Sequence, residues 1–188
     1  MNDKICTLDP ADYFRDWTFV DGVGNYAEHR ACVMSAIVAL RRAEAGVDLN
    51  GAIDTADCVC PVVRRLAIRR NDVMANADRK AWALGMIPRL MGSKASPAVT
   101  RARGFACADY ACRVIAPEWI DKAPRVVEAA ECRALSPIID VPIARAAQKV
   151  MQKIRTAAAY AAAAADAAIR LRHLDALLDC VLAIKETA

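Results

Sequence analysis

The chain has few of the residues from which β-sheet proteins are built. Of its 188 residues only 7 are Gly and 8 are Pro, and aromatic residues make up 5 %. A β-sandwich or barrel needs many Gly- and Pro-containing turns and a large share of aromatic and β-branched residues. The abundant residue is Ala, with 41 copies, and Ala has the highest helix propensity. The composition therefore predicts an all-α fold, a helical bundle.

Long apolar segments are also missing. A membrane-spanning helix needs about 18 or more apolar residues, and the nearest candidate, residues 157–169, is Ala-rich and interrupted by Asp166. Residues 1–14 carry acidic side chains where a signal peptide would need an apolar stretch. We therefore expect a cytoplasmic protein with no membrane partner.

The motifs of the common enzyme classes do not occur. The sequence contains no G-x-S-x-G, H-E-x-x-H, P-loop or G-x-G-x-x-G string. Its two histidines, His29 and His173, lie far apart in the sequence. Catalysis by a Cys–His pair needs a histidine beside a reactive cysteine and a third group to orient it. We expect a protein that is not an enzyme and that binds no cofactor.

Eight cysteines raise the question of a metal site. Cys58 and Cys60 form the one close pair, and Cys107 and Cys112 form a looser one. Zinc takes four tetrahedral ligands, usually from two pairs with wider spacing than C-x-C. Free cysteine in a helical protein usually behaves as a small buried apolar residue. We expect no metal, and a metal- or thiol-dependent site at Cys58 and Cys60 is kept as a second alternative.

Charge is distributed unevenly along the chain. Residues 1–57 contain five Lys or Arg and ten Asp or Glu, whereas residues 64–103 contain ten Lys or Arg and two Asp. We divide the chain into an acidic N-terminal helical segment, residues 1–57, and a helical bundle, residues 58–188. Because Arg65 and Arg69 are four residues apart, they lie on one helix face. The candidate partner-binding residues of the basic block are Arg64, Arg65, Arg69, Arg70, Arg79 and Lys80.

Three roles remain open for the basic block. It could pair with the acidic first 57 residues, bind an acidic protein, or bind nucleic acid. Arg outnumbers Lys by 19 to 7, and the arginine fork suits carboxylate and phosphate groups alike. Aromatic residues that could stack on bases are scarce near the block, and no helix-turn-helix motif is clear. These features favour a protein partner over nucleic acid.

Periodicity and caps predict the helices. We expect helices at about 26–45, 57–70, 76–91, 96–116 and 126–135. From Pro142 to Glu186 the chain has no Gly and no further Pro, which predicts one long Ala-rich helix over 142–186. Its Ala faces would let a second backbone approach closely and favour a homodimer. The predicted dimer interface consists of Ala158, Ala161, Ala162, Ala165 and Ile169.

Several short strings precede the Ala-rich tract. They are DCVCPV at 57–62, RND at 70–72, IPRLMGS at 87–93, ADY at 108–110 and APEW at 116–119. In order and spacing they resemble an uncharacterised family of Ala-rich helical proteins from bacteria and their phages, over about residues 55–188. The resemblance implies an all-α fold and a bacterial or phage setting, and no activity.

Together these features predict a non-enzymatic interaction protein. We expect it to be encoded by a phage or mobile element and to inhibit a bacterial protein or ribonucleoprotein complex, as anti-CRISPR proteins do. The first alternative is a nucleic-acid-binding accessory protein that uses the basic block.

Overall fold

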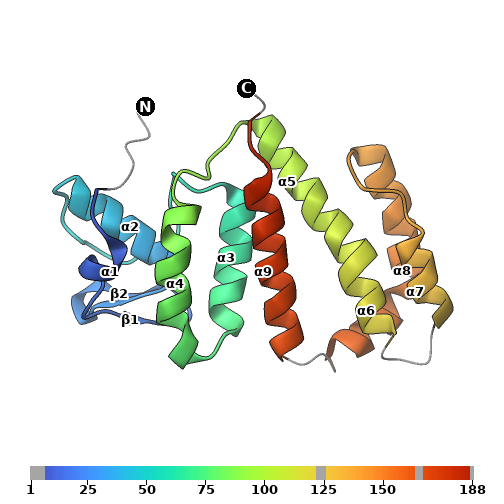
Figure 1. Cartoon of the computed structure of the whole chain (residues 1–188), viewed down its shortest axis with the longest axis horizontal. Coiled ribbons are helices and arrows are strands. Elements are labelled where there is room, and N and C mark those ends of the chain that lie inside the picture. Colours follow the sequence, from blue (N-terminus) through green and yellow to red (C-terminus); the bar gives the residue numbers. More distant parts are fainter. Residues whose placement is uncertain (1–6, 122–125, 164–166, 187–188) are drawn as a thin grey trace. The chain divides into compact units, whose positions relative to one another are not determined.

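The computed structural model describes residues 7–121, 126–163 and 167–186. The chain forms two compact units, residues 1–95 and residues 96–188, which Figure 1 shows in sequence colours. The boundary predicted between residues 57 and 58 lies inside the first unit.

The first unit begins with a short helix and a small sheet, so the protein is mostly helical and the all-α prediction was too strict. The opening helix and the strands are α1 (Pro10–Tyr13), β1 (Thr18–Phe19), β2 (Gly24–Asn25) and β3 (Arg30–Ala31), with the 3₁₀ helix η1 (Tyr26–Glu28) between β2 and β3. The sheet order is β1-β3-β2, with β1 parallel and β2 antiparallel to β3.

Two left-handed residues explain why no helix begins at 26, where the sequence predicted one. Gly24 has a φ of +89°, and a Cβ there would lie 2.4 Å from the carbonyl oxygen of Arg30. His29, with a φ of 52°, ends η1. A residue in this region cannot continue a right-handed helix, and L-residues with side chains rarely adopt it. The chain therefore turns at these two positions, and residues 24–31 form strands and a 3₁₀ turn where the sequence predicted an α-helix.

The central helix of the first unit, α2, spans Val33–Glu44. It begins at a capping box in which the backbone N–H of Cys32 donates to Ser35 Oγ at 2.8 Å. Every residue from Ala31 to Leu40 is buried. Ile37 and Leu40, which are both fully buried, are among the core residues on this helix.

Two further helices pack on α2 and on each other: α3 (Pro61–Val73) and α4 (Asn76–Leu90). The helix predicted over 57–70 corresponds to α3. It starts later than predicted, because the residue before its first turn is Cys60 and not Asp57. The helix predicted over 76–91 is confirmed within one residue. Pro88 lies inside α4 without ending it, and the helix continues to Leu90.

Asn71 ties α3 to the N-terminal segment. Its side chain is fully buried, and its Nδ2 donates to the carbonyl oxygen of Val20 at 2.9 Å. Its Oδ1 accepts from the backbone N–H of Val33 at 3.3 Å. One amide thus joins α3 to the strand region and to the start of α2, so the acidic first 57 residues are an integral part of this unit.

Tyr26 predicts a loss of stability at alkaline pH. Its hydroxyl donates to the Ser35 carbonyl oxygen at 2.6 Å, and burial raises the pKa of Tyr26 to about 12. The pKa is 10 for an exposed phenol, so the contribution of the protonated group is complete below pH 10 and is lost as the pH rises towards 12. We expect the free energy of unfolding, measured in urea, to fall more steeply between pH 9 and 11.5 for the wild type than for Tyr26→Phe. Equal slopes would contradict this assignment.

The described residues of the second unit form helices joined by loops, with no strand among them. The elements of this unit are α5 (Pro97–Tyr110), a π-helical turn η2 (Ala111–Ile115), α6 (Ala116–Ile120), α7 (Val126–Arg133), α8 (Val141–Ala163) and α9 (Ala167–Ala183). Helices α6, α7 and α8 contact one another, and α9 lies along α5, as Figure 1 shows. A small core of Ala116, Ile120, Ala129 and Cys132 forms where α6 meets α7.

Where the sequence predicted one long helix over 142–186, the structure describes two helical stretches, α8 and α9, which contact different neighbours. Residues 164–166, which separate them, lie outside the described residues. The end of α9 is fixed to the start of α5, because the Arg103 guanidinium donates to the Ile184 carbonyl oxygen at 2.8 Å and the Ser96 N–H donates to the Glu186 carboxylate at 2.7 Å.

Candidate functional site

The structure separates the six predicted basic residues into two groups, and three of the six are held by other parts of the first unit. Arg79 is only 2 % exposed and donates to the carbonyl oxygens of Asn71 at 3.0 Å and Met74 at 2.9 Å. Arg70 is buried, with its guanidinium 5.3 Å from the ring centroid of Trp82.

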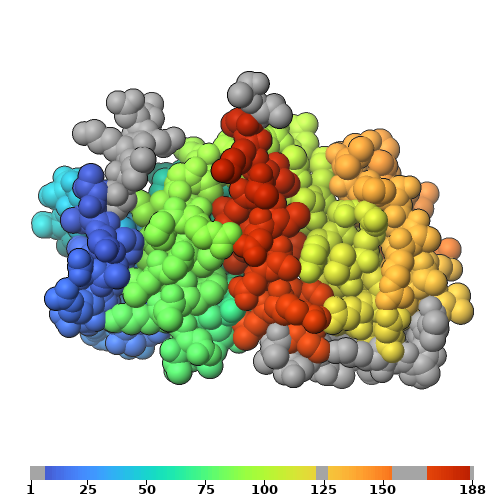
Figure 2. Space-filling view, viewed as in Figure 1, coloured from blue at the N-terminus to red at the C-terminus, as the bar shows by residue number. Residues whose placement is uncertain are grey.

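The third held residue is Lys80. Its ammonium donates to the carbonyl oxygen of Arg15 at 2.6 Å. This bond fastens α4 to the segment after α1, and Figure 2 shows these two parts of the chain side by side, in green and blue. Arg70, Arg79 and Lys80 thus have roles within the fold.

The other three basic residues are available to a partner. Arg65 and Arg69 are exposed and Arg64 is half-buried on α3. No side chain of these three makes a hydrogen bond or ion pair with any residue that the structure describes. We name Arg64, Arg65 and Arg69 the basic face of α3.

The acidic N-terminal residues do not neutralise this face within the described part of the first unit. The ion pairs there are local: Asp12 pairs with Arg15 at 2.7 Å, Glu28 with Arg30 at 3.2 Å. Pairing with the first 57 residues was one of the three roles predicted for the basic block. Among the described residues, the basic face of α3 makes no such pair.

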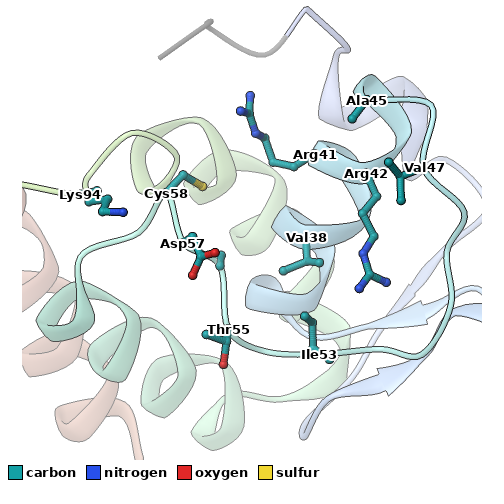
Figure 3. A pocket seen from close by; sticks show the side chains of 11 residues that line it. Val38, Arg41, Arg42, Ala45, Val47, Ile53, Thr55, Asp57, Cys58 and Lys94 are labelled. Carbon is teal, nitrogen blue, oxygen red and sulfur yellow. The ribbon is translucent and has the colours of Figure 1, made fainter. Parts of the chain in front are cut away.

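A cavity of about 650 Å³ is the second candidate site of the first unit (Figure 3). It lies between the end of α2, the loop that follows it, and Lys94. Three cations line it, Arg41, Arg42 and Lys94, and Asp57 is the single carboxylate among the lining residues that the structure describes. The cavity therefore attracts anions.

Two of these cations have partners within the chain. Arg42 donates to the carbonyl oxygens of Asn50 at 2.8 Å and Gly51 at 3.3 Å, and so holds the loop at the rim of the cavity. Arg41 pairs with Glu44 at 3.2 Å. Lys94 is exposed, and its ammonium contacts no acidic group among the described residues.

Figure 3 shows how the walls are arranged. The side chains of Lys94, Cys58 and Asp57 come from one side, and that of Arg42 comes from the other. Apolar side chains, among them Val38, lie between them. No sequence motif indicates this site, because its lining residues are spread over positions 38 to 94.

The two residues of the close cysteine pair have different surroundings. Cys58 lines the cavity, whereas Cys60 is buried and precedes the first turn of α3. The backbone N–H of Cys60 donates to Ser93 Oγ at 3.2 Å. No group of three or more His, Cys, Asp or Glu residues in the described part of the chain is placed to hold a metal ion.

A polar cluster around His173 joins three helices of the second unit. The His173 Nδ1 lies 3.3 Å from the Tyr110 hydroxyl, and its Nε2 lies 3.2 Å from the Glu118 carboxylate. Arg172 also pairs with Glu118. Burial raises the pKa of Tyr110, so its hydroxyl keeps its proton at neutral pH and is a poor nucleophile. We assign this cluster to the packing of α9 on α5 and α6.

The predicted dimer interface falls mostly outside the described part of the chain. This holds for the side chains of Ala158, Ala161 and Ala162 and for the whole of Ala165. Ile169 is half-buried on α9. The homodimer stays a prediction.

Comparison of the chain with protein-family models, with curated proteins and with solved structures finds no match. Within the described residues, no helix has both the length and the apolar character that crossing a bilayer requires.

Proposed function

We propose that this protein is a non-enzymatic binding protein that docks on an acidic surface of a bacterial protein or ribonucleoprotein complex. The observation that carries the proposal is the basic face of α3, where Arg64, Arg65 and Arg69 have no partner within the described chain. Arginines that face solvent without a partner can bind carboxylates or phosphates with two hydrogen bonds each.

The aromatic residues of this unit favour a protein partner. Proteins that bind single-stranded nucleic acid usually offer aromatic rings on which bases stack. Here Phe14, Trp17, Phe19 and Tyr26 are buried, and Trp82 lies under the Arg70 guanidinium. The basic face of α3 thus supplies charge without a stacking platform. Binding of nucleic acid by these same arginines is the alternative.

The biological setting that we propose is the one expected from the sequence. A small chain from a phage or mobile element that occupies the surface of a host defence complex would need a charged docking face and no catalytic centre. The basic face of α3 is suited to such a role, and inhibition of an anti-CRISPR kind is the form of the proposal that a host assay can address.

The decisive variant replaces Arg64, Arg65 and Arg69 together with Ala. Ala has the highest helix propensity, so this triple variant should fold as the wild type does. A matched control replaces Arg145, Lys149 and Lys153, three exposed cations on α8, with Ala. Both triple variants change the net charge equally, and therefore a difference between them reports on location rather than on total charge.

We expect tagged wild-type protein and the α8 control to retain the same stoichiometric protein from a nuclease-treated bacterial lysate. The basic-face variant should bind that protein at least tenfold more weakly, because interface arginines often each contribute more than 1 kcal/mol. Mass spectrometry identifies the protein and calorimetry measures its affinity. Equal affinity of the two triple variants would contradict the proposal.

Nucleic acid is the other outcome of the same experiment. If the bound material disappears on nuclease treatment, and its affinity for the wild type falls steeply with salt, the alternative replaces the proposal.

A further inference from the structure

The cavity of the first unit has the size and charge of a site for a small anion. Its volume of about 650 Å³ lies within the range of about 300–1,000 Å³ that small-molecule sites usually occupy. Three cations and one carboxylate line it, and Glu44, which is not among the lining residues, pairs with Arg41, so the net charge of this group is positive. This cavity is distinct from the basic face of α3.

We propose that the cavity binds a phosphate monoester of about nucleotide size, with its phosphate on the side that Arg41 and Lys94 line. A phosphate monoester carries between −1.5 and −2 charges at pH 7. Its negative charge is opposite in sign to the charges of Arg41 and Lys94 on this side of the cavity, where Arg41 also pairs with Glu44. Arginine binds phosphate oxygens in pairs, and lysine acts as a point charge.

The remaining walls suit the organic part of such a ligand. Val38, Val47 and Ile53 offer an apolar surface, against which a base or another flat group can lie. Asp57 is exposed at the cavity, and a carboxylate accepts hydrogen bonds without donating any. It can therefore accept hydrogen bonds from sugar hydroxyls, and it disfavours a second anionic group nearby.

Arg42 gives the cavity a fixed rim. Because its guanidinium holds the Asn50 and Gly51 carbonyl oxygens, the loop that carries Ile53 and Asp57 is anchored to α2. A site whose walls are already in place needs less ordering when its ligand binds. Lys94 is the cation to replace, because its side chain is exposed. Its backbone N–H donates to the Cys58 carbonyl oxygen at 3.0 Å, and replacement by Ala keeps this bond.

The experiment measures binding to the full chain by calorimetry, with AMP, ribose 5-phosphate, adenosine and inorganic phosphate as probes. We expect AMP to bind at least tenfold more tightly than adenosine, which lacks the phosphate, and than inorganic phosphate, which lacks the organic part. Ribose 5-phosphate should fall between AMP and inorganic phosphate. Lys94→Ala should weaken AMP binding about tenfold, as the loss of a charged contact implies.

Arg89→Ala is the matched control, because it removes an exposed cation of the same unit outside both the cavity and the basic face of α3. It should leave AMP binding within a factor of two. The proposal is overturned if neither AMP nor ribose 5-phosphate binds at 1 mM, if adenosine or inorganic phosphate binds as tightly as AMP, or if Lys94→Ala and Arg89→Ala behave alike. Since the basic face of α3 and the cavity are tested by different variants, either proposal can fail alone.

Discussion

Arg79→Ala should destabilise the first unit by about 3 kcal/mol. The Arg79 guanidinium donates to the carbonyl oxygens of Asn71 and Met74 at the end of α3, where helical carbonyls have no partner within the helix. Each buried polar group left without a hydrogen bond costs about 1–3 kcal/mol, and Arg79 is 2 % exposed, so water cannot easily replace it.

Urea unfolding followed by tryptophan fluorescence measures this effect, because Trp17 and Trp82 lie in the first unit. Arg65→Ala is the control, since an exposed substitution usually changes stability by less than about 0.5 kcal/mol. If the two variants unfolded at the same urea concentration, Arg79 would have no role in joining α3 to α4. Arg79→Lys should fall between them, because one ammonium cannot reproduce the geometry of the guanidinium fork.

Phe14→Ala should have the larger effect, a loss of about 3–5 kcal/mol, as is usual for a buried Phe. Phe14 is fully buried, and its ring packs edge-on against Tyr13 at 4.8 Å and Trp17 at 5.2 Å between centroids. A third ring, Phe19, lies 5.6 Å away. The substitution therefore removes the centre of an aromatic cluster that holds the N-terminal segment on the unit.

The same fluorescence measurement tests this prediction, and Phe14→Leu supplies the control. Leucine keeps the apolar character and most of the volume, so it should cost less than half as much as alanine. A loss below 1 kcal/mol for Phe14→Ala would mean that the segment of residues 7–31 contributes little to the stability of the unit.

The parts of the fold that could be predicted are those where one residue pattern dominates. The 76–91 helix follows from its apolar spacing and its acidic first turn, and the structure agrees within one residue. The start of α2 was missed because local geometry overrides helix propensity there. Only a backbone conformation, the left-handed Gly24 and His29, shows that the chain turns before it becomes helical.

The candidate site could be predicted only in part, for a similar reason. Spacing places Arg65 and Arg69 on one face of a helix, and both are exposed. Spacing does not say which face is covered, so Arg70 and Arg79 were included although the fold uses them internally. The cavity depends on residues brought together from α2, the loop that follows it and the loop after α4, and such long-range contacts leave no local pattern.

The hydrogen bonds of Ser96 with Glu186 have a consequence for how this chain could have been assembled. They bring the first and last described residues of the second unit to one point. A unit whose entry and exit coincide can be inserted into a loop of a host protein, or removed from it, without stretching the flanking chain. The second unit thus has the end-to-end geometry of an insertable domain, and both the basic face and the cavity lie in the first unit.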